Sequence, residues 1–306
     1  MTSKKPLELT ALHRALRVQF GERVRRDEPL ARHTTLQLGG PADLYVTAQS
    51  ADELVAAVSL AKAHGAPVFL LGGGANLVIA ETGIRGLVVA NHARKITFAG
   101  ETVRAESGAI LPRLSNLCAE HGLSGLEWAV GVPGTLGGAV VNNAGAYGSS
   151  IADTLIRAEL LLPDGSRVWQ AAEWFRYSYR SSRLKRGETR AVVLQAELRL
   201  SPAPAAEISA RMQKFTARRK SSQPPGATVG SMFKNPPGDY AGRLIEAAGL
   251  KGFRVGQAEI SPKHANFFVN LGGASADDVI TLINTARETV WQKFGVKLEL
   301  EIEIIE

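Results

Sequence analysis

The chain has 306 residues, which is enough for about two domains. Hydrophobic residues make up 45% of it and charged residues 21%, a balance that excludes a mainly disordered protein. Its 36 Lys and Arg against 29 Asp and Glu give a net charge of +7, which favours anionic ligands, while its single cysteine excludes an internal disulfide framework and a cysteine-based zinc site.

The N-terminal part is predicted to contain one amphipathic helix. Residues 5–20 place Leu9, Leu12 and Leu16 at helical spacing, and a polar linker follows. Charged residues occupy the positions where the apolar stretch of a secretory signal would lie. We therefore expect a cytoplasmic protein.

Between residues 30 and 200, short strands and glycine-rich turns dominate, and only two helices are predicted. The first begins at Ser50, with Glu53 three residues later as in a capping box, and ends at Gly65. The second carries an apolar stripe that includes Cys118, and it ends at Gly122. Because Cys118 lies on that stripe, we expect a buried packing residue rather than a nucleophile.

The last third of the chain is predicted to be α+β. Residues 201–204, Ser-Pro-Ala-Pro, are interpreted as a linker, and a basic helix follows with Met212 and Phe215 on its inner face. A long helix is predicted from about 276 to 294. Residues 297–304 alternate between charged and apolar side chains, which predicts a half-buried strand.

A first glycine cluster, residues 72–74, follows the apolar strand predicted for residues 68–71. Such a turn presents backbone N–H groups to an anion, so it is a candidate phosphate loop. A dinucleotide fingerprint of the Rossmann type would require a helix next, whereas residues 77–79 and 84–89 are predicted strands. A plain hairpin explains this cluster equally well.

A second and denser cluster covers residues 125–148. The uncharged window from 128 to 151 is long enough to span a bilayer, but a segment so rich in glycine could not satisfy its backbone in lipid. We interpret it as a loop that holds a ligand along its backbone. Its low charge suits a flat apolar ring, and a purely structural use of the glycines is the alternative.

At this second cluster the sequence resembles a known family, the UDP-N-acetylenolpyruvoylglucosamine reductases. The shared motifs occur in the order in which that family has them and cover about residues 30–305. They are Leu71-Gly-Gly-Gly-Ala-Asn76, Gly83-Ile-Arg-Gly86, Gly125-Leu-Glu-Trp-Ala-Val-Gly-Val-Pro-Gly134, Asn143-Ala-Gly-Ala-Tyr-Gly148, Tyr179-Arg-Ser181, Gly230-Ser-Met-Phe-Lys-Asn-Pro236, Ala241-Gly-Arg-Leu-Ile245 and Lys263-His-Ala-Asn266.

The resemblance implies an α+β fold with an FAD-binding domain of two subdomains, of the vanillyl-alcohol-oxidase (PCMH) type, and a C-terminal α+β substrate domain. On this chain it implies an N-terminal helix and linker at 1–29, FAD-binding subdomains at 30–90 and 91–200, and a substrate-binding domain at 205–306. The short stretch from 180 to 192 resembles the subclass that lacks an inserted tyrosine-bearing loop.

The resemblance also implies FAD and NADPH as cofactors. In such enzymes NADPH reduces FAD, and the flavin then gives a hydride to C3 of the enolpyruvyl group, so a proton is needed at C2. The two glycine clusters would hold FAD. The residues matched to cofactor binding are Gly72, Gly73, Gly74, Ala75, Asn76, Leu77, Ser107, Gly131, Pro133, Gly134, Thr135, Gly137, Gly138, Asn143, Gly145 and Val193.

Three residues match the family's catalytic set. Arg180 would bind the substrate carboxylate, Ser231 would give the proton to C2, and Glu301 would polarise the carboxylate. Each has a structural alternative. Arg180 lies in a basic run, and Ser231 follows a glycine as a turn serine would. Glu301 shares one strand face with Glu299 and Glu303.

Tyr179, Lys234 and Asn235 are matched to substrate binding, and the substrate is expected to be a UDP-sugar enolpyruvyl ether. We expect a monomer with no metal site and with neither a nucleic acid nor a membrane as partner.

Two other functions compete with the reductase. A flavin oxidase of small hydroxy compounds would keep the fold, but residues 230–236 and the C-terminal glutamate belong to the reductase pattern. A nucleic-acid binder would suit the net charge and the basic run at 218–220. Against it, the chain has no recognisable reading motif, and only 6% of its residues are aromatic.

Overall fold

The computed structural model describes residues 6–306, and they form two compact units. The first unit runs from the N-terminal helix to Arg26 and includes Leu44–Gly73 and Gly86–Arg218. The second unit combines Asp27–Asp43, Gly74–Arg85 and Arg219–Glu306. Each unit is thus built from segments that are distant in sequence, and each is described by itself.

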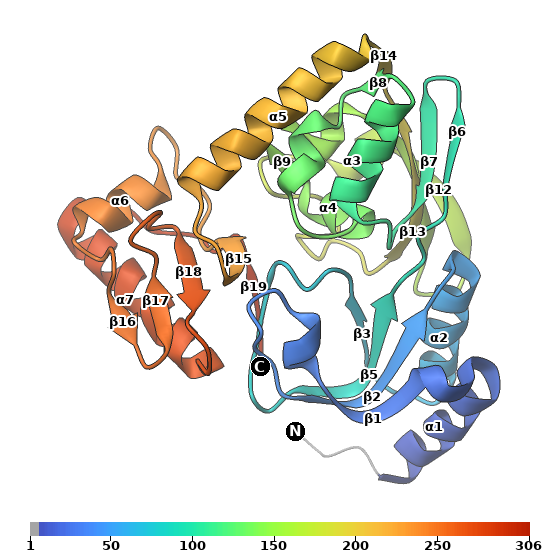
Figure 1. The fold of residues 1–306 in the computed structure, drawn as a ribbon. Helices are drawn as coiled ribbons and strands as arrows, with labels where there is room; N and C mark the ends of the chain where they lie inside the picture. The colour runs from blue at the N-terminus through green and yellow to red at the C-terminus, as the bar shows by residue number, and fades with distance from the viewer. Residues whose placement is uncertain (1–5) are drawn as a thin grey trace. The chain divides into compact units, whose positions relative to one another are not determined.

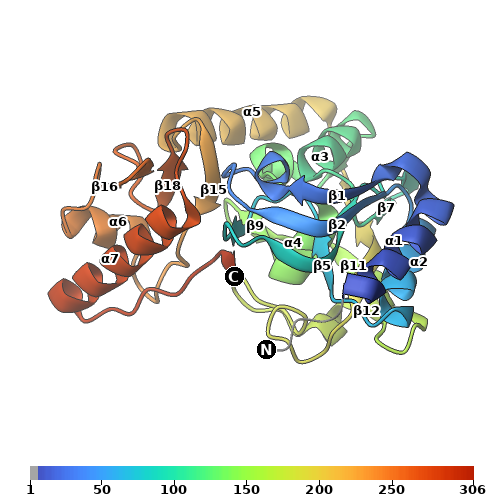
Figure 2. The same ribbon diagram turned by 90° about the horizontal axis from the view of Figure 1, so that it is seen from below.

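The first unit contains a four-stranded sheet of order β1-β2-β5-β3, in which β3 and β5 are parallel. The two helices of this region lie beside each other next to the sheet (Figures 1 and 2). Leucines, valines and alanines of the helices and strands form their common core. The elements are α1 (Pro6–Phe20), β1 (Val24–Pro29), β2 (Pro41–Ala48), α2 (Ala51–Ala63), β3 (Val68–Leu71) and β5 (Ile84–Asn91), with a 3₁₀ turn at Gly21–Arg23. The end of β1, the 3₁₀ turn Leu30–His33 and the start of β2 fall within residues 27–43 of the second unit.

A five-stranded antiparallel sheet of order β12-β11-β13-β7-β6 completes the first unit. Two helices, α3 and α4, cover one face of it and share its core (Figure 1). The elements are β6 (Ile96–Ala99), β7 (Thr102–Glu106), α3 (Leu111–Glu120), β8 (Leu123–Ser124), α4 (Leu136–Asn142), β9 (Gly145–Ala146), β10 (Ser149–Ser150), β11 (Leu155–Leu161), β12 (Arg167–Ala171), β13 (Val192–Arg199), β14 (Ser201–Pro202) and α5 (Ala205–Ser222), with 3₁₀ turns at Glu127–Gly131, Ile151–Asp153 and Ala172–Phe175.

The second unit is built on an antiparallel sheet of order β15-β18-β17-β16. Helices α6 and α7 pack against it around a core that includes the T-shaped pair Phe233 and Phe268. A separate parallel pair joins β4 to β19 at the end of the chain. The elements are β4 (Leu77–Ile79), β15 (Ala227–Ser231), α6 (Ala241–Ala247), β16 (Arg254–Val255), β17 (Ala258–Ile260), β18 (Phe267–Asn270), α7 (Ala276–Phe294) and β19 (Glu303–Ile305).

Most of the predicted helices are confirmed with their ends. Ser50 caps α2 by accepting a hydrogen bond from the Glu53 backbone N–H at 3.1 Å. The capping box is not complete, because the Glu53 carboxylate accepts from the backbone N–H of Gln49, one residue before the cap, and also pairs with Arg23. Helix α7 begins at a complete capping box and ends at Gly295, whose positive φ of 65° favours glycine.

The prediction for Cys118 is also confirmed. Its side chain is buried in the core between α3 and the second sheet. Burial, followed by the charge of Glu127, raises the pKa of this thiol to about 12. A thiol with that pKa holds almost no thiolate near neutral pH and is therefore a packing residue.

Three predictions of secondary structure are wrong. The stretch from 128 to 151 is not an irregular loop, because its centre forms α4, with Leu136, Ala139 and Val140 buried. Residues 201–202 are not a free linker, since they pair with β8. The strand predicted for 297–304 is confined to β19, because the chain changes partner from Phe233 to β4 before Glu303.

The two compact units also differ from the four expected segments. Most of α5, expected to begin the substrate domain, belongs to the first unit. Residues 30–43 and 74–85, expected in the first FAD subdomain, belong to the second unit, as do residues 27–29 of the expected N-terminal linker. The functional roles assigned to those segments remain predictions, because a compact unit is defined by contacts and not by what it binds.

Candidate active site

The two glycine clusters meet in the first unit. A Cβ placed on Gly73 would lie 2.8 Å from the Cα of Gly134, and one on Gly72 would lie 2.8 Å from the hydroxyl of Thr135. A Cβ on Gly137 would lie 2.9 Å from the Cβ of Ser107. The glycines therefore allow the two loops to approach each other backbone to backbone, as the cofactor prediction requires.

Ser107 links this contact to the second sheet. Its backbone N–H donates to the Leu194 carbonyl at 2.9 Å, and its carbonyl accepts from the Gly137 N–H at 2.7 Å. Its hydroxyl accepts from the side-chain amide of Asn91 at 2.7 Å. Val193, the remaining predicted residue here, is buried on β13. The predicted residues of the first unit thus form one connected group around the start of α4.

A buried donor beside this group has no partner. The indole Nε1 of Trp128 is buried and is the single side-chain polar atom of residues 6–306 that is recorded as buried without a hydrogen bond. It lies on the 3₁₀ turn that ends at the predicted cofactor residue Gly131. Buried N–H groups in native proteins are normally paired. An acceptor supplied by a bound group would satisfy it, so this observation and the glycine contacts fit a cofactor at this place.

Arg180 occupies a two-residue turn in the first unit. The backbones of Ser178 and Ser181 exchange two hydrogen bonds of 3.1 Å across it. Arg180 itself has a φ of +53°, a conformation that is uncommon for a side chain of this size. Its guanidinium donates to the Gly145 carbonyl at 2.5 Å and lies over the ring of Tyr179, 5.3 Å from the centroid.

Three further contacts fix this turn to the end of α4. The Tyr177 hydroxyl donates to the Val140 carbonyl at 2.9 Å, and the Ser182 hydroxyl donates to the carbonyl of the next residue at 2.6 Å. The Asn143 amide donates to the Ser178 carbonyl at 2.9 Å. Tyr177 and Ser182 therefore satisfy carbonyls that the last turn of a helix leaves unpaired. Sequence reasoning missed both residues, although they flank Arg180.

Ser231 and Glu301 are brought together in the second unit. Ser231 ends β15, and the Glu301 backbone N–H donates to the carbonyl of Met232 at 3.0 Å. The next rung joins the Lys234 N–H to the Glu299 carbonyl at 2.8 Å. Ser231 and Glu301 are both half-buried. A single intervening residue thus connects the two predicted catalytic groups.

The second part of the first glycine cluster adjoins Glu301. The Asn76 amide donates to the Glu301 carbonyl at 3.2 Å, and the Asn76 carbonyl accepts from the Glu303 N–H at 2.9 Å. Leu77 then starts β4, which runs parallel to β19 with Leu77 opposite Glu303. Gly74 has a φ of +59° and no room for a Cβ, which would lie 2.1 Å from the His33 carbonyl.

The neighbouring glutamates and the predicted substrate residues differ in exposure. Glu299 is 76% exposed and pairs with Lys234 at 3.4 Å, so it is a surface carboxylate. Asn235 accepts from the Ala241 N–H at 3.1 Å and so fixes the start of α6. Tyr179 is 54% exposed.

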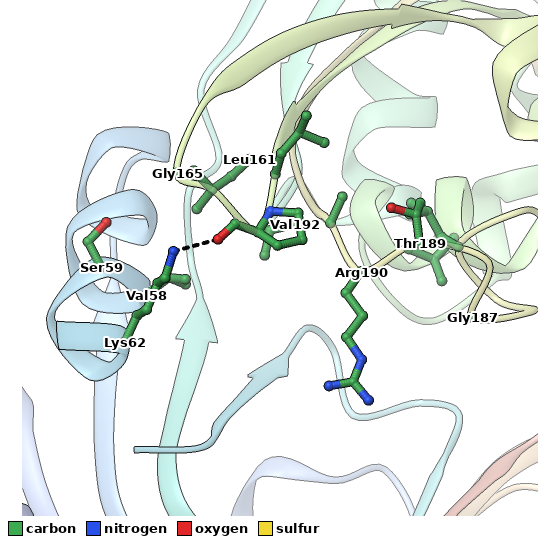
Figure 3. Close-up of a pocket in the computed structure, with 14 residues that line it drawn as sticks. Val58, Ser59, Lys62, Leu161, Gly165, Gly187, Thr189, Arg190 and Val192 are labelled. Atoms are coloured by element: carbon green, nitrogen blue, oxygen red, sulfur yellow. Dashed lines mark hydrogen bonds between the residues drawn. The ribbon is translucent and has the colours of Figure 1, made fainter. Parts of the chain in front are cut away.

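A cavity of about 420 Å³ lies between α2 and the segments 161–165 and 184–192 of the first unit (Figure 3). Valine, leucine and alanine side chains form most of its wall. The ammonium of Lys62 binds the Pro163 carbonyl at 2.6 Å on one side, and Arg190 lies on another (Figure 3). None of the predicted cofactor residues lines this cavity.

Comparison with known proteins identifies the chain. A family model for the C-terminal domain of UDP-N-acetylenolpyruvoylglucosamine reductase matches residues 222–305, and one for an FAD binding domain matches residues 42–170. A UDP-N-acetylenolpyruvoylglucosamine reductase from Rubrobacter xylanophilus is 48% identical over 281 residues, which cover 91% of this chain and 94% of that one. The chain belongs to the UDP-N-acetylenolpyruvoylglucosamine reductase family.

Two further relatives match this chain over nearly their whole length. The reductase from Moorella thermoacetica is 44% identical over 300 residues, or 97% of this chain and 98% of that one. The crystal structure of the reductase from Thermus caldophilus superposes with a TM-score of 0.80 at 38% identity, covering 93% of this chain and 99% of that one.

Family membership confirms the fold class and the main cofactor. The chain is an FAD-dependent oxidoreductase with an α+β FAD-binding domain. Within residues 6–306, no helix is both long and apolar enough to cross a bilayer.

Proposed function

We propose that the protein uses NADPH and FAD to reduce the enolpyruvyl ether of UDP-N-acetylglucosamine to UDP-N-acetylmuramate, a step of peptidoglycan precursor synthesis. The similar proteins from three bacteria carry the name of this reductase. The observation that carries the proposal is the direct backbone connection between the segments of Ser231 and Glu301 in a chain of that family. A nucleotide sugar and NADPH as substrates also favour a cytoplasmic location.

The residues around the start of α4 would hold FAD. Gly72, Gly73 and Gly134 offer backbone N–H groups to the pyrophosphate without side chains in the way. Trp128 offers the unpaired indole N–H. Bound FAD, once reduced, supplies the hydride for C3 of the enolpyruvyl group.

Arg180, Ser231 and Glu301 would then act on the substrate. The guanidinium of Arg180 binds the carboxylate of the enolpyruvyl group through its fixed fork of donors. Negative charge develops at C2 and spreads into that carboxylate. Glu301, acting as an acid, would polarise the substrate carboxylate by donating a hydrogen bond to it. The Ser231 hydroxyl donates its proton to C2, and water or a nearby cation such as Lys234 stabilises the remaining alkoxide.

Anaerobic mixing tests this function. The holoenzyme is photoreduced and mixed with the enolpyruvyl nucleotide, and the return of the oxidised flavin absorbance is followed. We expect rapid return in the wild type and a loss of about 10²–10⁴-fold in Ser231→Ala, with flavin reduction by NADPH unchanged. Ser209→Ala, at an exposed position of α5, is the control. Photoreduced wild type that stays reduced contradicts the function, and normal reoxidation of Ser231→Ala contradicts the assigned proton donor.

A further inference from the structure

We infer that Asn266 is a positioning residue for the reduction step, because its side chain holds the segment that joins Ser231 to Glu301. The inference rests on the proposed function, in which these two residues act on the substrate. Asn266 itself lies in the turn before β18 and is 3% exposed, so it does not reach a ligand from the surface.

The chain changes its pairing partner at Ser231. Strand β15 pairs with β18 from Ala227 onward, but the register shifts between Thr228 and Ser231, where Gly230 has a φ of +82°. After Ser231 the chain leaves β18, and Phe233 forms a bridge with Leu300 of the C-terminal segment. Ser231 therefore stands at a bulge, at a point where regular strand pairing ends.

Where pairing with β18 ends, the Asn266 side chain forms hydrogen bonds that a neighbouring strand would otherwise form. Its Oδ1 accepts from the Phe233 N–H at 2.9 Å, and its Nδ2 donates to the Phe233 carbonyl at 2.8 Å. Its own backbone carbonyl accepts from the Met232 N–H at 2.8 Å. Asn266 thus satisfies three of the four backbone groups of the two residues after Ser231, and Glu301 satisfies the fourth. Phe233 is fully buried, so water cannot supply these bonds.

The same segment carries Glu301 on its other side. The Met232 carbonyl accepts from the Glu301 N–H, while the Met232 N–H donates to the backbone carbonyl of Asn266. A movement of Met232 would shift two things together: its hydrogen bond to the Glu301 N–H, and the neighbouring residue Ser231 with its hydroxyl. The side-chain amide of Asn266 fixes Phe233, the residue bonded to Met232, and so restrains Met232 from that side. Because a displacement of about 1 Å from the reactive geometry can cost about a hundredfold in rate, loss of this amide should slow proton transfer from Ser231.

Asn270, at the other end of β18, provides a matched control. It is also buried, and its side chain bonds three backbone groups, those of Leu36, Gly272 and Ala274, where the Asn266 side chain bonds two. None of these groups belongs to the segments of Ser231 or Glu301. Loss of the Asn270 amide should therefore cost stability to a similar degree without affecting the reduction step.

The experiment compares Asn266→Ala and Asn266→Asp with Asn270→Ala and Ser231→Ala as FAD-loaded enzymes. For both Asn266 variants we expect flavin reduction by NADPH at the wild-type rate and reoxidation by the enolpyruvyl nucleotide slowed about ten- to a hundredfold. Asn266→Asp keeps the shape but turns a carboxylate oxygen toward the Phe233 carbonyl, and it serves if the alanine variant does not fold. Asn270→Ala should reoxidise normally at a matched loss of melting temperature.

The double variant Ser231→Ala/Asn266→Asp separates positioning from general weakening. If Asn266 acts through Ser231, the double variant reoxidises no more slowly than Ser231→Ala alone. Fully additive losses, or an equal slowing in Asn270→Ala, would overturn the inference. Normal reoxidation of Ser231→Ala would instead overturn the proposed function, so the two failures are distinguishable.

Discussion

Glu197 shows how a single buried carboxylate can make the stability of this protein depend on pH. It lies on β13 and binds Arg157 at 2.5 Å and also Arg104, and both guanidinium groups lie over the ring of Trp169. The hydrogen bond from Arg157 lowers the pKa of the Glu197 carboxyl, burial opposes this, and Arg104 lowers the pKa further. The net shift is downward from 4.5.

A carboxyl whose pKa is lower in the folded chain stabilises the fold above its unfolded pKa and loses this contribution as the pH falls through the folded value. We therefore expect Glu197→Gln to lower the free energy of unfolding by about 1–3 kcal/mol near neutral pH and by much less well below pH 4.5. Urea unfolding of the wild type and of Glu197→Gln, near neutral pH and well below pH 4.5, measures this difference in the free energy of unfolding. A difference that stays constant with pH would contradict the assignment.

The roles assigned to single site residues stay predictions, and the contacts that support these residues were not predictable from the sequence. Glu301 was separable from Glu299 and Glu303 through family spacing alone, because alternation places all three on one face. The structure adds a physical reason, which is the bond to Met232. Asn266 and Tyr177 could not be assigned in this way, since their roles depend on which distant backbone group each one meets.

At the scale of elements, α4 shows which glycines serve the fold and which remain for a ligand. A Cβ on Gly137 would lie 2.9 Å from Ser107, so the fold itself requires this glycine. A Cβ on Gly138, one residue later in the same helix, would meet nothing nearer than the Thr135 hydroxyl at 3.7 Å. The fold therefore gives no reason for glycine at 138.

We expect Gly138→Ala to keep or slightly raise the stability of the FAD-free protein, by up to about 1 kcal/mol, because alanine favours a helix. The added methyl group should nevertheless weaken FAD binding if the cofactor lies against this position, as predicted. Titration of the FAD-free protein with FAD, followed by flavin fluorescence, measures the affinity. Gly137→Ala is the comparison, and it should lose both stability and FAD. Unchanged affinity in Gly138→Ala would remove Gly138 from the cofactor site.

Helix α4 was not predicted because its sequence, Leu-Gly-Gly-Ala-Val-Val-Asn, has two glycines and two β-branched residues, which disfavour an isolated helix. Tertiary packing overrides that preference, since Leu136, Ala139 and Val140 are buried. Helices α2 and α7 were predictable because their caps and apolar spacing act locally. The C-terminal strand was predicted too long, because strand pairing depends on partners that lie elsewhere in the chain.

At the scale of the whole molecule, the predicted FAD residues belong to both compact units. Gly72 and Gly73 lie in the first unit, and residues 74–77 lie in the second. FAD that binds only the folded protein would stabilise it by mass action, by about 2.7 kcal/mol at a free FAD concentration one hundred times its dissociation constant. Removal of FAD should therefore lower the melting temperature of the protein.

Amide hydrogen exchange with and without FAD locates this effect. Without FAD we expect faster exchange at residues 72–77 and 131–138, because backbone N–H groups bound to a ligand lose their protection when it leaves. Exchange in α7, which packs only within the core of the second unit, should change little and serves as the internal control. Changes confined to the cavity segments, 58–62 and 187–192, would mean that FAD binds there and not on the glycine loops. Gly73 lies against Gly134, so a ligand bound where these two glycines meet would contact both glycine clusters. We therefore expect the two clusters to lose protection together when FAD is removed.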